Sequence, residues 1–413
     1  MTNFYIKSLG CKQNALEGQI IKNDLIDAGL IEVFDIKNAD IFILNSCTVT
    51  SHSDSQVNYL LSHAKKQNPK IKNILTGCCA QTGNYKIENV DVVVGNSEKS
   101  NILDFIQKNG IFVQDIFKQE KFQNKFLTNC FTTRMNIKIQ DGCNNRCSYC
   151  IIPYARGKSR SNSIENIIKQ IQIAHDTGIK EIVLTGIHIG QWGLEWDKTL
   201  LDLLKEIEKT KIHRYRLGSL YVNEITDEMI DFLKKSEKFC PHFHLSLQSL
   251  CDKTLKNMNR FYTKLDALLL IEKLHKNFTL PFLGCDIIVG FPYEDENDFQ
   301  ETYNNLKGAK LSYIHCFPYS PRKGTPAYDL PQIQDIIKSQ RAKKLQDLSK
   351  QLHKNFLDLN KNTTAEILVQ KKSDKNNLYS AITKNYIKIF LDDKRNDLRG
   401  TLKTVDLSEF DLF

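Results

Sequence analysis

The sequence has no apolar run of about 18 residues, the length a membrane-spanning helix requires. Its first residues, "MTNFYIKSLG", lack the basic region and apolar core of a secretory signal, and a cytoplasmic location is therefore expected. The chain also lacks internal repeats and low-complexity segments. These absences predict a globular protein without a membrane partner.

The composition narrows the class further. At 413 residues, 41% of them hydrophobic and 25% charged, the chain is long enough for two or three domains with buried cores. Its 12 cysteines are not expected to form disulfides in the cytoplasm, which favours metal binding or catalysis. The formal net charge of +9 agrees with a nucleic-acid partner, although a lysine-rich composition alone gives such a value.

Residues 1–110 alternate strand and helix patterns. "FYIKSLG", "DIFILN", "KNILTG" and "VDVVVG" indicate strands, and "LEGQIIKNDLIDAGL" and "SQVNYLLSHAKKQN" indicate helices between them. Strands that alternate with helices pair in parallel, so this part predicts a small doubly wound sheet. The mixed, polar residues 111–133 that follow resemble a linker.

A second strand–helix series begins at "MNIKIQDG". It continues through "EIVLTG", "YRLGS", "FHLSL", "CDIIVGF" and "YIHCFPYS", which predicts an open or partial parallel barrel. A long lysine-rich helix is predicted over residues 336–360. From about residue 361 the pattern changes to short strands without helices, which predicts a small all-β module.

The segment "DGCNNRCSYC" contains Cys143, Cys147 and Cys150 in the spacing C-x3-C-x2-C. Structural zinc sites have four protein ligands, typically as two separated pairs. Three clustered cysteines with no fourth Cys or His nearby instead suit a [4Fe–4S] cluster with one iron free for another ligand. Because the segment follows a predicted strand, we expect it at the catalytic edge of the barrel. A zinc site or incidental thiols are the alternatives.

Three further cysteines each occupy the turn after a predicted strand: Cys11, Cys47 and Cys78. In a parallel sheet such turns share the carboxyl edge, so distant cysteines can converge there. A glycine directly before Cys11 and before Cys78 would let the backbone turn closely around a cluster. On spacing alone, three buried apolar cysteines are an equal alternative, and only one of Cys78 and Cys79 need be a ligand.

Together the motifs resemble the radical S-adenosylmethionine (SAM) methylthiotransferase family over nearly the whole chain. "LGCKQN", "NSCTVT" and "GCCAQ" are similar to its N-terminal motifs, and the β tail resembles its small RNA-binding TRAM module. Six further segments are similar to the motifs of its radical SAM core: "DGCNNRCSYCIIPYARGKSRS", "EIVLTGIHIGQWG", "HFHLSLQS", "MNRFYT", "DIIVGFPYE" and "FPYSPRKGTPA". The chain departs from the family's usual residues at Gly218, Tyr221 and Leu250.

The resemblance implies a methylthiotransferase N-terminal domain over 1–110, a partial (β/α) radical SAM barrel over 130–355 and a TRAM-like β module over 361–413. It implies two [4Fe–4S] clusters, one held by Cys143, Cys147 and Cys150 and one by Cys11, Cys47 and Cys78. The first cluster binds SAM and makes a radical from it, while the second carries the sulfur that is transferred. The expected partners are tRNA and an electron donor such as flavodoxin or ferredoxin, and the expected state is a monomer.

Other residues are predicted at the site with less support. Five positions at the ends of predicted strands are candidates to contact SAM, with ordinary turn glycines as the alternative for two of them: Gly186, Ser246, Gln248, Asp286 and Gly290. His244 and His315 lie within strand patterns and are expected to be core residues rather than ligands. Arg156, Lys158 and Arg160, after the cluster loop, are expected either to meet tRNA phosphates or to form a solvated basic face.

The substrate prediction depends on "LGCK", with Lys12, and on "NSCTVT". These resemble members that act on N6-threonylcarbamoyladenosine in tRNA, and Lys12 is the candidate to pair with the carboxylate of that substrate. Members that act on isopentenyladenosine tRNA or on a ribosomal protein are the alternatives within the family. A two-cluster iron–sulfur protein without turnover is the alternative from another class.

Overall fold

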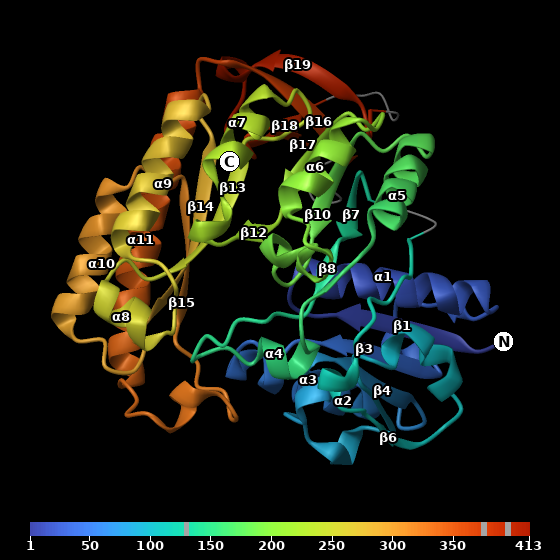
Figure 1. Ribbon diagram of the computed structural model, residues 1–413. Helices are drawn as coiled ribbons and strands as arrows, with labels where there is room; N and C mark the ends of the chain where they lie inside the picture. Colours follow the sequence, from blue (N-terminus) through green and yellow to red (C-terminus); the bar gives the residue numbers. More distant parts are fainter. Residues whose placement is uncertain (128–131, 373–377, 393–397) are drawn as a thin grey trace.

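The computed structural model describes residues 1–127, 132–372, 378–392 and 398–413 (Figure 1). Three parts of the sequence predictions lie outside these ranges. They are residues 128–131, at the junction of the predicted linker and core, and residues 373–377 and 393–397 of the predicted β module. Within the described ranges, the helices are too short or too polar to cross a membrane.

The N-terminal part forms one parallel sheet with the strand order β2-β1-β3-β4-β5-β6. The central strand β3 is buried along its whole length, as expected for a strand with neighbours and helices on all sides. The predicted doubly wound parallel sheet is therefore confirmed. The strands are β1 (Asn3–Ser8), β2 (Ile31–Glu32), β3 (Ile41–Ser46), β4 (Lys72–Gly77), β5 (Val92–Val94) and β6 (Gly110–Phe112).

Helices α1 (Lys12–Asp27), α2 (Ser51–Gln67) and α3 (Cys78–Thr82) connect these strands. Thr50 caps the start of α2, because its hydroxyl accepts a hydrogen bond from the backbone N–H of Ser53 at 3.2 Å. The structure differs from the prediction at the far edge of the sheet. Strand β6 and a short 3-10 helix, Ile116–Lys118, occupy part of the segment that was expected to be a linker.

The central domain contains the six predicted strands, which curve into an open barrel. They form two sheets, β11-β10-β7 and β12-β13-β14-β15, because the strand around Gly218 is split in two. All strand pairs in both sheets are parallel. The bounds are β7 (Arg134–Lys138), β10 (Glu181–Thr185), β11 (Arg214–Leu217), β12 (Ser219–Leu220), β13 (His242–Gln248), β14 (Phe282–Val289) and β15 (Tyr313–Pro318).

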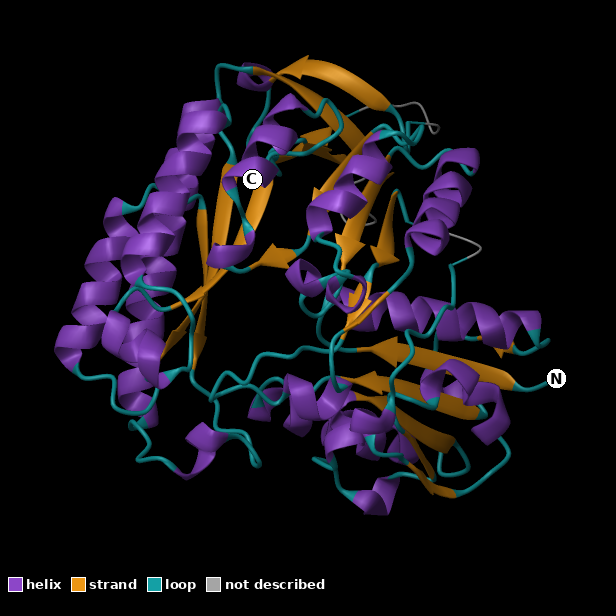
Figure 2. Ribbon diagram, viewed as in Figure 1, coloured by secondary structure: helices purple, strands orange, loops and turns teal. Residues whose placement is uncertain are grey.

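Helices cover the outside of this barrel (Figures 1 and 2). Alternate residues of β13, such as Phe243, Leu245 and Leu247, are buried in the main hydrophobic core against them, which leaves the other residues of the strand on the inner face. The helices are α4 (Ile152–Arg156), α5 (Ile164–Asp176), α6 (Leu200–Glu208), α7 (Asp227–Lys235), α8 (Asp252–Asn257), α9 (Lys264–Asn277), α10 (Glu296–Gly308) and α11 (Asp335–Asn360), and a short ribbon pairs β8 (Gln140–Asp141) with β9 (Arg160–Ser161).

The C-terminal module is the predicted all-β unit. It is an antiparallel sheet in the order β18-β17-β16-β19, formed by β16 (Thr364–Lys372), β17 (Tyr379–Thr383), β18 (Lys388–Leu391) and β19 (Leu402–Asp406). Figure 1 shows it at the top of the molecule, over the ends of the barrel strands. Tyr386, in the turn between β17 and β18, packs against His242, the first residue of β13, with ring centroids 4.4 Å apart. The module therefore covers the amino-terminal end of the barrel.

A buried ion group joins this module to the barrel. Glu181 accepts from Arg214 Nε at 2.7 Å and from Arg216 Nε at 2.9 Å, and all three side chains are at most 1% exposed. Arg216 also donates to the carbonyls of Thr383 and Lys384, both at 2.7 Å. Burial alone would raise the pKa of Glu181, but the two guanidinium groups hold that pKa below its usual value. The carboxylate is therefore ionised, and besides the two buried arginines it also pairs with Arg134 Nη1 at 3.4 Å.

Changing Glu181 to Gln is expected to lower the free energy of unfolding by about 3 kcal/mol, because two buried guanidinium groups lose their common counter-charge. Urea unfolding followed by circular dichroism measures the change. The matched control is Glu206→Gln, which breaks a pair with Lys209 whose side chains are 39% and 69% exposed, and should cost less than about 1 kcal/mol. Equal losses in the two variants would contradict the importance of the buried group.

Candidate functional site

The loop with Cys143, Cys147 and Cys150 follows β8 and precedes α4. Burial raises the pKa of Cys143 to about 11 and that of Cys150 to about 12, and the thiolate of Cys147 nearby raises both further. Thiols with raised pKa values stay protonated at neutral pH, so cysteines in this buried site become thiolates only when a cationic group lies between them. A positively charged metal centre meets that condition.

The spacing of the thiols distinguishes between metals. Within the described ranges, neither cysteine triad brings its three sulfur atoms within 4.8 Å of one another. A single zinc ion, with Zn–S bonds of about 2.3 Å, would draw three sulfurs closer than that. An iron–sulfur cube binds each cysteine to a different iron and so holds its ligands farther apart. Both triads therefore fit a cluster better than a mononuclear site.

Four side chains that the sequence analysis did not assign to the site surround the first triad. His188 Nδ1 lies 3.3 Å from Cys143 Sγ, and Arg260 Nη1 donates to Cys147 Sγ at 3.5 Å. The ring of Tyr221 lies between them, 4.1 Å from that of His188 and 3.8 Å from the guanidinium of Arg260. Glu224 pairs with the other nitrogen of His188. His188 and Arg260 fall in the quoted motifs, but no spacing rule marked them.

The three cysteines of the second triad lie in turns at the carboxyl edge of the N-terminal sheet. Cys11, Cys47 and Cys78 follow β1, β3 and β4, which are neighbours in the sheet. Gly10 and Gly77 both adopt positive φ, of 88° and 92°. A Cβ atom at Gly10 would lie 2.7 Å from Cys47 Sγ, and one at Gly77 would lie 2.5 Å from the Ser46 carbonyl. Glycine therefore lets the three turns approach one another closely.

The structure also separates Cys78 from Cys79. Cys78 acts electrostatically on both Cys11 and Cys47, whose pKa values are raised by burial and then by these neighbouring thiolates. Cys79 is fully buried in the hydrophobic core of the N-terminal sheet and donates to the Asn84 carbonyl at 3.1 Å. Its geometry is that of an apolar core residue, so the triad contains Cys78.

Arg156 links the two triads, contrary to both predictions for it. The side chain is 1% exposed and therefore neither meets tRNA phosphates nor belongs to a solvated face. It forms a fork with Glu17 of α1, at 2.6 and 3.0 Å, and its Nε donates to Cys78 Sγ at 3.3 Å. Arg160 is buried as well, whereas Lys158 is exposed. Only Lys158 of the three remains available to RNA.

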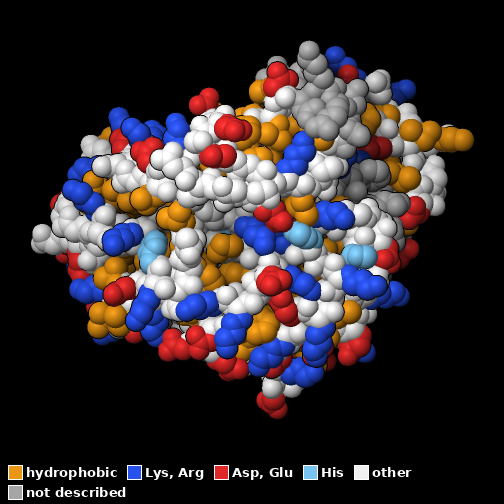
Figure 3. Space-filling model, turned by 90° about the horizontal axis from the view of Figure 1, so that it is seen from above, with side chains coloured by type: hydrophobic (Ala, Val, Ile, Leu, Met, Phe, Trp, Pro, Cys, Tyr) orange, Lys and Arg blue, Asp and Glu red, His pale blue; other side chains and the backbone are white. Residues whose placement is uncertain are grey.

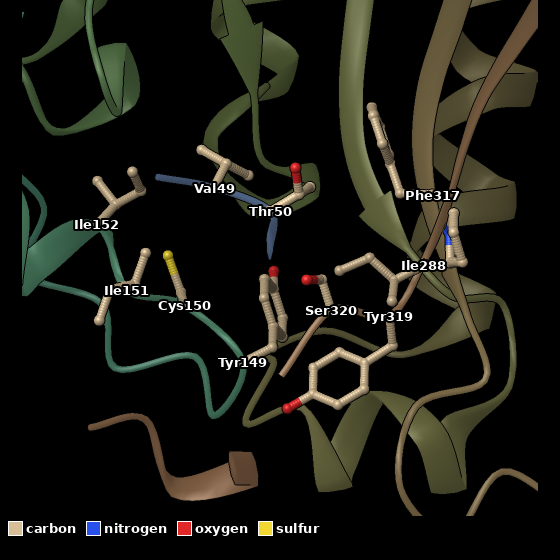
Figure 4. Close-up of a pocket in the computed structure, with 11 residues that line it drawn as sticks. Val49, Thr50, Tyr149, Cys150, Ile151, Ile152, Ile288, Phe317, Tyr319 and Ser320 are labelled. Carbon is tan, nitrogen blue, oxygen red and sulfur yellow. The ribbon is translucent and has the colours of Figure 1, made fainter. Parts of the chain in front are cut away.

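A cavity of about 140 Å³ lies beside the first triad (Figure 4). Tyr149, Cys150 and Ile151 of the cluster loop line it on one side, and residues from two other parts of the chain close it. These are Val49 and Thr50, shortly after Cys47, and Ile288, Phe317, Pro318, Tyr319 and Ser320 of the barrel. The mostly apolar lining suits a flat ring, and the cavity lies between the loops of both triads.

The residues predicted to contact SAM differ in their positions. Gly186 and Gly290 directly follow β10 and β14, but a Cβ atom on Gly290 would collide with Lys338, and one on Gly186 would lie 2.9 Å from the Gln140 carbonyl. Packing within the chain therefore explains both glycines. Ser246 and Gln248 lie at the carboxyl end of β13, and Gln248 has a φ of 61°, which is strained for a residue other than glycine.

The position of Asp286 corrects the sequence analysis. It was expected at a strand end, but it lies three residues before the end of β14, on the inner face of the barrel. His244 and His315 were expected in the core, and that prediction is wrong: His244 is half-buried and His315 is exposed, beside Asp286. Lys12 is exposed as well, next to Cys11.

Comparisons with known proteins fit this geometry. Residues 137–306 match the model of the Radical SAM superfamily, and residues 3–95 match that of the uncharacterized protein family UPF0004. Threonylcarbamoyladenosine tRNA methylthiotransferase MtaB of Aquifex aeolicus (strain VF5) is 37% identical, covering 93% of this chain and 95% of that protein. The chain belongs to the radical SAM methylthiotransferase family. MtaB of Bacillus subtilis (strain 168) is also 37% identical, over 94% of this chain and 90% of that protein.

This methylthiotransferase has more distant relatives with other substrates. The tRNA-2-methylthio-N(6)-dimethylallyladenosine synthase of Clostridium botulinum is 30% identical, covering 99% of this chain and 95% of that protein. Among solved structures, the radical SAM methyltransferase TsrM of Kitasatospora setae has a TM-score of 0.57 at 12% identity over 79% of this chain and 77% of that one, a likeness of fold. The methylthiotransferase is thus an enzyme whose cofactors are SAM and two [4Fe–4S] clusters.

Proposed function

We propose that the protein transfers a methylthio group to C2 of N6-threonylcarbamoyladenosine next to the tRNA anticodon, at position 37. The observation that carries this proposal is the position of Lys12, an exposed lysine directly after Cys11 of the second triad. A lysine at this place can sense a carboxylate on the modified base while the base lies beside the second triad. The relatives at 37% identity are named for the same substrate.

The three cysteines of the barrel loop hold the first cluster in this proposal. When bound, a cluster there would supply the electron for the reductive cleavage of SAM, and a cluster at the second triad would supply the sulfur. Adenine C2 has no acidic proton and no leaving group, so a radical is needed to form a C–S bond there. Arg260 and His188 hold Cys147 and Cys143 in place. The cavity beside Cys150 takes an adenine ring, and Gln248 and Ser246 are the polar groups proposed to meet SAM at the end of β13.

Cys11, Cys47 and Cys78 would hold the second cluster. Arg156 donates to Cys78 and is anchored by Glu17, so the residue that positions this triad is part of the segment that follows the first triad. The side chains thereby fix the separation of the two sites. Transfer between two sites requires such a fixed distance, because each reacting group must reach the same base.

The proposed partners are tRNA and an electron donor such as flavodoxin or ferredoxin, with the protein acting as a monomer. Figure 3 shows Lys and Arg side chains interspersed with Asp and Glu on the face seen from above, so the net positive charge is spread over that face. Exposed Lys158, directly after the cluster loop, is a candidate for a phosphate contact near the site.

The substrate can be tested in cells. Nucleosides from the tRNA of a strain without this gene should contain threonylcarbamoyladenosine that lacks the methylthio group, while the isopentenyladenosine derivatives stay unchanged. A site built for a carboxylate binds a wholly apolar group less well, because the charge-assisted pair with Lys12 is not formed. Mass spectrometry of the digested tRNA measures both classes. Loss of the methylthio group from isopentenyladenosine alone would overturn the substrate proposal and leave the cluster assignments intact.

A further inference from the structure

The inner face of the β12–β15 sheet carries polar side chains that the two cysteine triads do not use. Phe243 and Leu245 of β13 are buried against the outer helices, so His244 between them points to the inner face. Asp286 of β14 and His315 of β15 lie on the same face. His244 and Asp286 are half-buried and His315 is exposed, so all three are accessible to a ligand.

These three side chains form a compact group. Asp286 and His315 are direct neighbours in the register of β14 and β15, and His244 Nε2 lies 3.5 Å from a carboxylate oxygen of Asp286. The hydroxyl of Ser219 lies 2.9 Å from the other nitrogen of His244 and fixes that ring. One polar atom from each of the three lies within 4.8 Å of the others. A single small group can therefore contact all three.

The charge near this group favours an anionic ligand. Burial, and then the ammonium of Lys12, lower the pKa of His244 to about 4, and burial, His244 and Lys12 lower that of His315 as well. Both imidazoles are therefore neutral at pH 7, and Lys12 supplies the positive charge. Lys12 forms no ion pair with any residue in the described ranges. A metal cation would be repelled by this ammonium, whereas a carboxylate would pair with it.

We propose that Lys12, His244, Asp286 and His315 form a receptor for the threonyl end of the substrate. The inference rests on the proposed function, because the threonylcarbamoyl group is the part of that substrate with both a carboxylate and a hydroxyl. Lys12 and a ring N–H of His315 pair with the carboxylate. Asp286, oriented by His244, accepts the hydrogen bond of the hydroxyl, and Lys12 offsets the repulsion between the two carboxylates.

The arrangement also explains how recognition and reaction are coupled. In adenine, C2 and C6, which carries N6, both flank N1, so the modified side chain and the reacting carbon lie on the same side of the ring. Lys12 is adjacent to Cys11 of the second triad. A carboxylate held by Lys12 therefore places the base near the sulfur-carrying site, and a base without that carboxylate is not held there.

The test uses the anaerobic holoenzyme and three anticodon stem–loop RNAs. They carry threonylcarbamoyladenosine, its carboxyl methyl ester, or isopentenyladenosine at the position of the modified base. Fluorescence anisotropy gives the dissociation constants, and mass spectrometry gives kcat/KM for methylthio transfer. The wild-type protein should bind the acid roughly tenfold or more tightly than the ester, since a charge-assisted pair is lost in the ester.

His315→Ala and Lys12→Gln should lower this acid-to-ester ratio to about one, and Asp286→Asn should weaken binding of both threonyl RNAs. The control His175→Gln removes an imidazole that contacts Asp176 on the exposed face of α5, and should keep the wild-type ratio. Iron content and 5′-deoxyadenosine formed without RNA identify any variant that has not folded, and His315→Gln then replaces His315→Ala.

Two results would overturn the proposed receptor, and only one of them would also overturn the proposed function. If the wild-type protein modifies the threonylcarbamoyl RNA but the variants keep its acid-to-ester ratio, the receptor is wrong and the proposed function stands. If the wild-type protein modifies only the isopentenyl RNA, the proposed function fails and the receptor fails with it.

Discussion

Replacing Cys143, Cys147 and Cys150 with alanine is expected to abolish SAM cleavage and to halve the iron content of the protein. Two four-iron clusters give about eight irons and eight acid-labile sulfides per chain, and the variant should hold about four of each. The physical reason is that the variant loses all three thiols of this loop, and the neighbouring His188, 3.3 Å from Cys143 Sγ, offers only a single nitrogen in their place. Iron and sulfide assays after anaerobic reconstitution, together with chromatography for 5′-deoxyadenosine, measure both effects.

The matched control changes three cysteines of the same domain that lie outside both triads, Cys240, Cys251 and Cys316. That variant should keep about eight irons and cleave SAM. A wild-type iron content near four would contradict the assignment of a second cluster to Cys11, Cys47 and Cys78. SAM cleavage by the variant without the three loop cysteines would contradict the assignment of the first.

The variant with Cys11, Cys47 and Cys78 changed to alanine is expected to lose methylthio transfer completely and to retain slow SAM cleavage. The two triads lie at the edges of different sheets. When the N-terminal thiols are removed, the barrel loop therefore keeps its three cysteines and their contacts with Arg260 and His188. Its product assay with RNA should show 5′-deoxyadenosine without methylthiolated base.

Cys79→Ala is the control for this experiment, because Cys79 is adjacent to Cys78 but points into the hydrophobic core. It should transfer the methylthio group, with a stability loss of the size expected for a small core truncation. Methylthiolation of RNA at the normal rate by the triple variant would show that the second triad does not carry the sulfur.

Much of the fold could be predicted because its strands have simple sequence patterns. "DIFILN" and "KNILTG" are short apolar runs bounded by turn residues, and both form buried strands of the N-terminal sheet. The edge strands β2 and β6 were missed since they have two and three residues, too few for any periodicity. Gly218 stood out in the sequence only as a departure from the family's usual residue. The break between β11 and β12 at this position was not predicted, because it depends on the curvature of the whole sheet and not on the sequence of one strand.

The site was predictable to a different degree in each of its parts. Local spacing indicated Cys143, Cys147 and Cys150. The shared edge of a parallel sheet indicated only that Cys11, Cys47 and Cys78 could converge, and the family resemblance implied that they are ligands. The Arg156–Glu17 pair joins residues 139 apart in sequence, and no local pattern indicates such a contact. The inward direction of His244 was available in principle, since "HFHLSLQ" alternates polar and apolar residues.

The contacts of Arg214 and Arg216 impose an order on events while the protein is being made. Their carbonyl partners, Ile382, Thr383 and Lys384, come 167 or 168 residues later in the chain. At ribosomal rates of about 5–20 residues per second, these partners are synthesised roughly 10–30 s after the two arginines. During that interval Glu181, which is synthesised earlier, can already pair with both. The nascent barrel thus has a counter-charge before its end is covered, and a chain released early would expose that end to solvent.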